Sequence, residues 1–194
     1  MVEKLKVILV EPDRDRALMI VDGLRDGGAF DIEIIGDDTA LARRVAEAQP
    51  DVVLIDIDNP SRDTMEELAL ASGPLERPVA IFADHSDEGA TKAAIEAGVS
   101  AYVVDGLEKH RVRPVLDAAR ARFQLFRRMR TELSAAKTAL AERKTIDRAK
   151  GLLMSARGIS EEEAYQLLRN TAMNQGRKVS EIAEALVTAS DLLK

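Results

Sequence analysis

Carboxylates stand at the ends of two apolar runs in the first third of the chain. Residues 52–63 read VVLIDIDNPSRD, so the run at 52–55 leads directly to Asp56 and Asp58. The run VILV at 7–10 leads in the same way to Glu11 and Asp13. Clustered carboxylate oxygens are the ligands that hard cations such as Mg²⁺ prefer. These residue types would form an acidic pocket, provided that the fold brings the two runs together.

The first half of the chain supplies elements that would do so. Short β-type runs alternate with amphipathic helical stretches, a pattern typical of a parallel sheet with helices on both faces. Five strands at this spacing predict a flavodoxin-like doubly wound α/β fold, in which ligands bind at the carboxyl ends of the strands. Glu11, Asp13 and Asp56 would form an acidic pocket there. We predict strands at 5–10, 32–35, 51–56, 78–83 and 101–104, and helices near 14–26, 39–48, 62–72 and 87–97.

The second half is predicted to be all helical. The β-type runs stop near residue 112, and no proline follows Pro114. Apolar residues then recur at intervals of three and four, the spacing of a coiled-coil seam. We predict that this seam pairs two copies of the chain; packing on the chain's own N-terminal domain is the alternative. The seam consists of Phe126, Met129, Leu133, Ala136 and Leu140.

Local signals divide the C-terminal region into three helices. The long helix should end at Arg157, because Gly158 can take the left-handed conformation of a C-cap. Ser160 and Glu163 have the spacing of a capping box, which begins a second helix. Ser180 is predicted to cap a third helix.

The net charge of −6 is unevenly distributed along the chain. Residues 1–110 hold 11 Lys and Arg against 24 Asp and Glu, a net charge of −13, whereas residues 111–157 hold 13 against 4, a net charge of +9. Basic side chains can neutralise phosphates, which supplies most of the sequence-independent affinity for nucleic acid. A solvated helix face is the alternative. The residues predicted to bind RNA are Lys144, Arg148, Lys150, Arg157, Arg169, Arg177 and Lys178.

The C-terminal third resembles the ANTAR domain family. The match runs from about 135 to 190 and is carried by IDRAKGLLMSARGISEEEAYQLLRNTAM at 146–173 and VSEIAEALV at 179–187. ANTAR proteins bind tandem short hairpins in nascent mRNA and prevent a terminator from forming. The resemblance implies an RNA-binding transcription antiterminator.

Three residues of this region have roles that the sequence leaves open. Tyr165, its sole aromatic residue, stands beside Ala164 at an apolar position and is predicted to be core. Arg169 would either contact a base or brace the helices. Gly151 lies inside a helix, where glycine costs about 0.5–1 kcal/mol relative to alanine. A close approach by RNA or by a neighbouring helix would explain that glycine.

The N-terminal domain resembles the receiver domains of two-component systems. Asp56 matches the phosphate acceptor by its spacing to Pro60. The family pattern also has an acidic pair after the first strand, a Ser or Thr after the fourth and a lysine after the fifth. In this sequence the lysine position holds Asp105, and the charge of a carboxylate has the wrong sign to stabilise a phosphoryl group. We therefore expect little phosphorylation of Asp56 and no cofactor, with Mg²⁺ at the acidic pocket left open. The three family positions hold Glu11-Pro12, Ala83 and Asp105.

Together the resemblances imply a response-regulator antiterminator of the NasT and AmiR kind. They divide the chain into a receiver-like domain at 1–113, a helical coiled-coil linker at 114–134 and an ANTAR domain at 135–194. We expect control by a ligand-sensor protein that acts through the receiver-like domain, as in nitrate and nitrite assimilation. The rival prediction is a conventional response regulator, phosphorylated at Asp56, that binds RNA or DNA.

Composition and motifs exclude other classes. The chain has no cysteine, so it has neither disulfides nor thiolate metal sites. Its apolar runs are far shorter than the roughly 20 residues of a membrane span. No nucleophile elbow, Walker loop or dinucleotide fingerprint accompanies the carboxylates. We expect a cytoplasmic protein that is not an enzyme and has no metal site.

Overall fold

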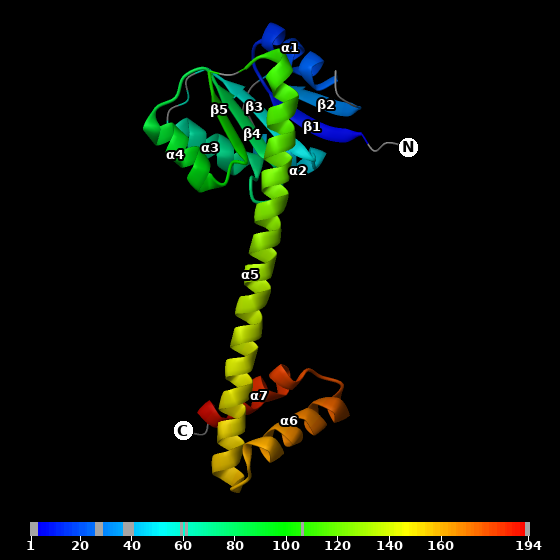
Figure 1. Cartoon of the computed structure of the whole chain (residues 1–194), viewed down its shortest axis with the longest axis vertical. Coiled ribbons are helices and arrows are strands. Elements are labelled where there is room, and N and C mark those ends of the chain that lie inside the picture. The colour runs from blue at the N-terminus through cyan, green and yellow to red at the C-terminus, as the bar shows by residue number, and fades with distance from the viewer. Residues whose placement is uncertain are drawn as a thin grey trace. The chain divides into compact units, whose positions relative to one another are not determined.

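The chain forms two compact units. The computed structural model (Figure 1) describes residues 4–25, 29–36, 41–58, 60, 62–105 and 107–192. One unit is Met1–Arg128 and the other is Met129–Lys194. The boundary lies inside the long helix α5 (Lys109–Arg157), so each unit contains one part of that helix. The predicted fold class, a doubly wound α/β domain followed by a long helix and a three-helix domain, is confirmed.

The first unit is built on a five-stranded parallel sheet of order β2-β1-β3-β4-β5. All five predicted strands and all four predicted helices are present, with ends that shift by about two residues or fewer; residues 26, 39 and 40 lie outside the described residues. The strands are β1 (Leu5–Val10), β2 (Phe30–Ile35), β3 (Val52–Ile57), β4 (Val79–Ala83) and β5 (Ala101–Val104). The helices are α1 (Arg14–Arg25), α2 (Leu41–Ala48), α3 (Arg62–Ser72) and α4 (Glu88–Ala97).

Each face of the sheet carries its own hydrophobic core, because successive side chains of a strand point to opposite faces. On one face Ile8 and Ile55 pack with buried residues of α2, α3 and α4. On the other face Leu9 and Leu54 pack with buried residues of α1 and of the first turns of α5. The strands β1, β3 and β4 are therefore covered on both sides and hold their carboxyl ends firmly in place.

Helix α1 packs unusually closely on the first turn of α5. A Cβ atom added to Gly23 of α1 would lie 2.5 Å from the backbone oxygen of Lys109. This distance is shorter than real Cβ contacts, so only glycine fits at position 23. The glycine allows the backbones of the two helices to touch.

The second unit is a three-helix domain formed by the end of α5, α6 (Glu161–Gln175) and α7 (Val179–Leu192). Its core contains small buried side chains, Ala149, Ala172 and Ala183, beside Leu168 and Ile182. The small residues allow the helices to approach closely. No helix in the described part of the chain combines the length and the apolar character that a membrane span requires.

The capping predictions for this unit are partly confirmed. Helix α5 ends at Arg157, and the capping box forms, with the Ser160 amide donating to Glu163 Oε2 at 2.8 Å. The prediction that Ser180 caps α7 is wrong. Helix α7 already begins at Val179, and the Ser180 hydroxyl instead lies 3.4 Å from Glu142 Oε1 on α5.

Candidate functional site

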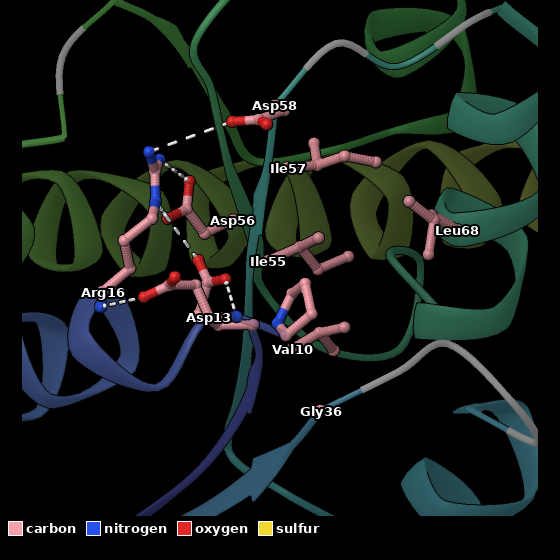
Figure 2. Close-up of a pocket in the computed structure, with 11 residues that line it drawn as sticks. Val10, Asp13, Arg16, Gly36, Ile55, Asp56, Ile57, Asp58 and Leu68 are labelled. Atoms are coloured by element: carbon pink, nitrogen blue, oxygen red, sulfur yellow. Dashed lines mark hydrogen bonds and ion pairs between the residues drawn. The ribbon is translucent and has the colours of Figure 1, made fainter.

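A cavity of about 660 Å³ lies at the carboxyl ends of β1 and β3 (Figure 2). The strand order reverses between these two strands, which is where ligands bind in open α/β sheets. Val10 pairs with Ile55 in the register, so both strands end at the same level. The wall includes aliphatic side chains such as Leu68 and Ile57. The charged residues among those that line the cavity are Glu11, Asp13, Arg16, Asp56 and Asp58.

Arg16, in the first turn of α1, binds the predicted acceptor Asp56 at two points. Its Nε lies 2.8 Å from Asp56 Oδ2, and its Nη2 lies 2.9 Å from Asp56 Oδ1. The same guanidinium binds Asp84, just after β4, at 2.7 and 2.9 Å. Figure 2 shows this side chain reaching toward Asp56 and Asp58. The Asp56 carboxylate is fully buried, so its charge is compensated by the protein and not by water.

The other two members of the predicted acidic pocket have different roles. Glu11 is buried, lies 3.5 Å from Arg16 Nε and accepts a hydrogen bond of 2.7 Å from the Asp13 amide. Asp13 lines the cavity, but its Oδ1 accepts from the amides of Asp15 and Arg16 at 2.8 and 2.9 Å. These contacts satisfy free amides at the start of α1. Glu11 and Asp56 therefore share the site, whereas Asp13 mainly orders the helix that carries Arg16.

The protonation states follow from burial and from these contacts. Burial first, and hydrogen bonding with Asp56 second, raise the pKa of Glu11 to about 8. Hydrogen bonds from Arg16 lower the pKa of Asp84. Bonds to Asp84 and Asp56 raise the pKa of Arg16 itself. Near neutral pH the site therefore contains a mostly protonated Glu11 and a permanent guanidinium cation.

This arrangement does not fit Mg²⁺ binding as a receiver would perform it. Both Asp56 oxygens are bound by Arg16, and Asp13 is engaged at the helix start. Mg²⁺ demands several oxygen ligands in near-octahedral geometry. Among the described residues, no group of three or more His, Asp or Glu side chains is placed to hold a metal ion.

The remaining receiver positions lack the groups that would handle a phosphoryl group. Ala83 ends β4 and is buried, with no hydroxyl to offer. Asp105 follows β5, is exposed and is not among the residues that line the cavity. The positive charge of the site comes from α1 and not from the end of β5.

Sequence reasoning gave no role to Arg16. The signal that could have found it was the number of carboxylates expected at one sheet edge, since buried charges are normally paired. The first turn of α1 follows β1 directly and holds two candidates for that partner, Arg14 and Arg16. Arg16 makes the contact, and Arg14 is exposed.

In the second unit, three of the seven residues predicted to bind RNA are held in ion pairs. Lys150 Nζ lies 2.6 Å from Asp147 Oδ1 and 2.7 Å from Glu161 Oε1, with 15% of its side chain exposed. Arg148 binds Asp191 of α7 at 2.6 Å, and Arg177 binds Glu181 at 3.3 Å. Lys150 and Arg148 thus link α5 to α6 and to α7.

The other four predicted residues present free charges. Their side chains are exposed, and among the described residues they make no ion pair. They come from the end of α5, from α6 and from the loop before α7, and are Lys144, Arg157, Arg169 and Lys178.

Tyr165 and Gly151 differ from expectation. Tyr165 is 41% exposed, so the prediction that it belongs to the core is wrong; its neighbour Ala164 is fully buried instead. Gly151 is exposed, and an added Cβ would meet no atom within 4 Å. Packing against a neighbouring helix of the same chain therefore does not explain this glycine.

The predicted seam residues lie exposed on α5. Relative exposure is 48% for Phe126 and 53% for Met129, and it reaches 56% for Leu133 and Leu140. The alternative, in which the seam packs on the N-terminal domain, would bury these side chains. The first part of α5 uses other residues for that packing, namely Val112, Leu116, Ala119 and Phe123, all of them buried.

Comparison with known proteins supports both halves of this description. Residues 134–187 match the ANTAR domain family. The transcriptional regulatory protein PdtaR of Mycobacterium tuberculosis is 26% identical over 94% of this chain and 89% of its own length. The nitrate regulatory protein of Klebsiella oxytoca is 46% identical over 31% of this chain and 15% of its own. The aliphatic amidase regulator of Pseudomonas aeruginosa is 29% identical over 71% of this chain and 70% of its own length.

A CheY-like response regulator from Mesorhizobium loti has a similar fold to the first unit. The TM-score is 0.51 at 14% identity, over 60% of this chain and 99% of that chain. The fold and the domain match define a chain in which a domain with the receiver fold is followed by a helical ANTAR domain. Residues 134–187 thus form an ANTAR domain, and the chain as a whole is similar to transcriptional regulators.

Proposed function

We propose that this protein binds tandem hairpins in a leader mRNA through its ANTAR domain and thereby prevents a terminator from forming. The observation that carries the proposal is the ANTAR match over residues 134–187. The exposed charges of Lys144, Arg157, Arg169 and Lys178 support it, because they have no ion-pair partner in the described part of the chain and can neutralise phosphates without first breaking an ion pair.

The signal is proposed to arrive through a partner protein and not through a phosphorylated Asp56. An Asp56 carboxylate bound at both oxygens by Arg16 is a poor nucleophile and offers no free ligand to a metal ion. The conventional response-regulator alternative would require that Arg16 leave the site. A ligand sensor that recognises the acidic first unit can act without that step, since complementary charge favours partner choice and encounter.

The seam is proposed to join two copies of the chain. Its apolar side chains are about half exposed and repeat with heptad spacing, as in a coiled-coil dimer. Two hairpins in one RNA would then meet two ANTAR domains, and linked binding raises overall affinity without new contacts. The similarity of a 61-residue stretch of the chain to the nitrate regulatory protein supports nitrate or nitrite assimilation as the process controlled.

The test is a binding assay of the full chain against three nucleic acids of equal length. A two-hairpin leader RNA should bind more tightly than a single hairpin or duplex DNA. Arg169→Ala should weaken RNA binding, whereas Arg43→Ala on α2, also an exposed arginine, should not. Equal affinity for all three nucleic acids would contradict RNA recognition.

A second assay separates the two modes of control. Incubation with a small phosphodonor and Mg²⁺ should leave Asp56 unmodified by intact-mass analysis. Induction in cells should survive Asp56→Asn. Stoichiometric phosphorylation, together with loss of induction in Asp56→Asn, would favour the conventional response regulator.

A further inference from the structure

The exposed flank of α6 carries an aromatic side chain that the fold does not use. The inward side of α6 is formed by Ala164, Leu168 and Ala172, all buried. Tyr165 is one position further along the helix, about 100° around its axis. It is 41% exposed, and among the described residues its hydroxyl has no hydrogen-bond partner. The core of the second unit is therefore complete without this ring.

Two further exposed side chains lie on the same flank at one-turn intervals. Residues four apart on a helix lie on one face. Arg169 follows Tyr165 by four positions and is exposed, with no ion pair to any described residue. Met173 follows by four more and is 69% exposed. We call Tyr165, Arg169 and Met173 the α6 stripe; it combines an aromatic ring, a free cation and a flexible apolar side chain.

These side-chain types are suited to an unpaired base. Single-stranded bases in hairpin loops are recognised by stacking on aromatic rings or guanidinium planes and by hydrogen bonds to their edges. The other five aromatic residues of the chain precede Met129. Tyr165 is therefore the sole aromatic ring that the ANTAR domain can offer to a base.

We propose that the α6 stripe reads the hairpin loop, with the Tyr165 ring stacked on one unpaired base and Arg169 bound to the adjoining phosphate or base edge. This inference rests on the proposed function, that the ANTAR domain binds hairpin RNA. It adds that sequence recognition lies on α6, while the ion-paired Lys150 and Arg148 hold the helices together. A base on the stripe would be covered on one side by Tyr165 and kept near the helix by the Arg169 charge.

The experiment places 2-aminopurine, a fluorescent base that is quenched by stacking, at each loop position of a two-hairpin RNA. The full-length protein is compared with Tyr165→Phe, which keeps the ring, and Tyr165→Leu, which keeps only apolar bulk. Gln166→Leu is the matched control, because it adds an exposed leucine to α6 on another face. Should Tyr165→Leu melt the domain, Tyr165→Met takes its place.

With the wild type and with Tyr165→Phe, 2-aminopurine fluorescence should be quenched at one loop position, and the two proteins should bind the RNA with equal affinity. Tyr165→Leu should lose that quenching and bind about 5–150-fold more weakly, the range expected for one base–aromatic stack. Gln166→Leu should behave as the wild type. Tyr165→Leu with wild-type affinity and quenching would overturn the stacking role and leave RNA binding intact.

Other outcomes also decide the matter. If Tyr165→Phe bound the RNA as weakly as Tyr165→Leu, the effect would belong to the hydroxyl, and the stacking role would be overturned. A change of oligomeric state in Tyr165→Leu, measured by light scattering, would make the stripe an interface between copies and overturn the proposal. No binding of the hairpin RNA by the wild type would overturn both this inference and the proposed function.

Discussion

Replacing Arg16 tests whether its guanidinium holds the receiver-like pocket together. Arg16→Met keeps a side chain of similar length and removes the charge. Asp56, fully buried, would then carry a negative charge without a partner. Breaking a buried ion pair by removing one member costs about 3–5 kcal/mol. Because Arg16 and Asp84 are each about one third exposed, water can partly replace the cation, and we expect the lower end of the range.

For a domain of this size, each kcal/mol lowers the melting temperature by about 3–5 °C. Arg16→Met should therefore melt about 9–15 °C below the wild type in calorimetry of the full chain. Arg14→Met, in the same helical turn but exposed, is the matched control and should change little.

A double-mutant cycle isolates the interaction with Asp56. Asp56→Asn removes the buried charge, so the Arg16→Met/Asp56→Asn protein should be markedly more stable than the sum of the single effects predicts. Two results would refute the reasoning. One is a melting temperature of Arg16→Met equal to that of Arg14→Met; the other is strict additivity in the cycle.

Three further predictions concern other features of the structure. The pKa of Glu11 is raised to about 8, so the folded state binds a proton that the unfolded state releases, and stability should fall as pH rises from about 4.5 to 8. In thermal melts, Glu11→Gln should be more stable than the wild type at pH 8, and this difference should vanish near pH 4.5. A difference that does not depend on pH would contradict the raised pKa. Gly23→Ala should destabilise the first unit by about 1–3 kcal/mol through its clash with the Lys109 carbonyl, whereas Gly151→Ala should stabilise the second by about 0.5–1 kcal/mol in urea unfolding; effects of equal sign would show that the two glycines do not differ in packing. If the four free cations each meet a phosphate, raising salt from 50 to 200 mM should weaken RNA binding by about 50–150-fold per chain in filter-binding titrations, and a salt-independent affinity would rule out phosphate contacts.

The fold was predictable because hydrophobic periodicity decides it. The runs at 7–10 and 52–55 were recognisable as buried strands, and their ends bring Glu11 and Asp56 together because the two strands are neighbours in the parallel sheet. The same reasoning could not find Arg16. Its contacts join α1 to the ends of β3 and β4, 40 and 68 residues away, and no local pattern encodes such a reach.

In the ANTAR domain, the structure differs from expectation at single positions on a helix. Tyr165 is apolar enough for a core, but Ala164 occupies the inward position, and one residue turns a helix by about 100°. Lys150 looked available for RNA, yet Asp147 lies one turn before it and Glu161 begins the next helix. The Glu161 pairing depends on how α5 and α6 pack, which the sequence does not display.

Helix α1 touches two distant parts of the first unit. Its first turn carries Arg16 into the pocket, and Gly23, seven positions later, contacts the first turn of α5. Backbone contact at Gly23 leaves no side chain between the two helices that could absorb a displacement, so a movement of α1 would also move the first turn of α5. A sensor protein that displaced Arg16 would therefore shift the start of α5. The signal would then be transmitted by the position of α5, and it would depend neither on phosphodonors nor on magnesium.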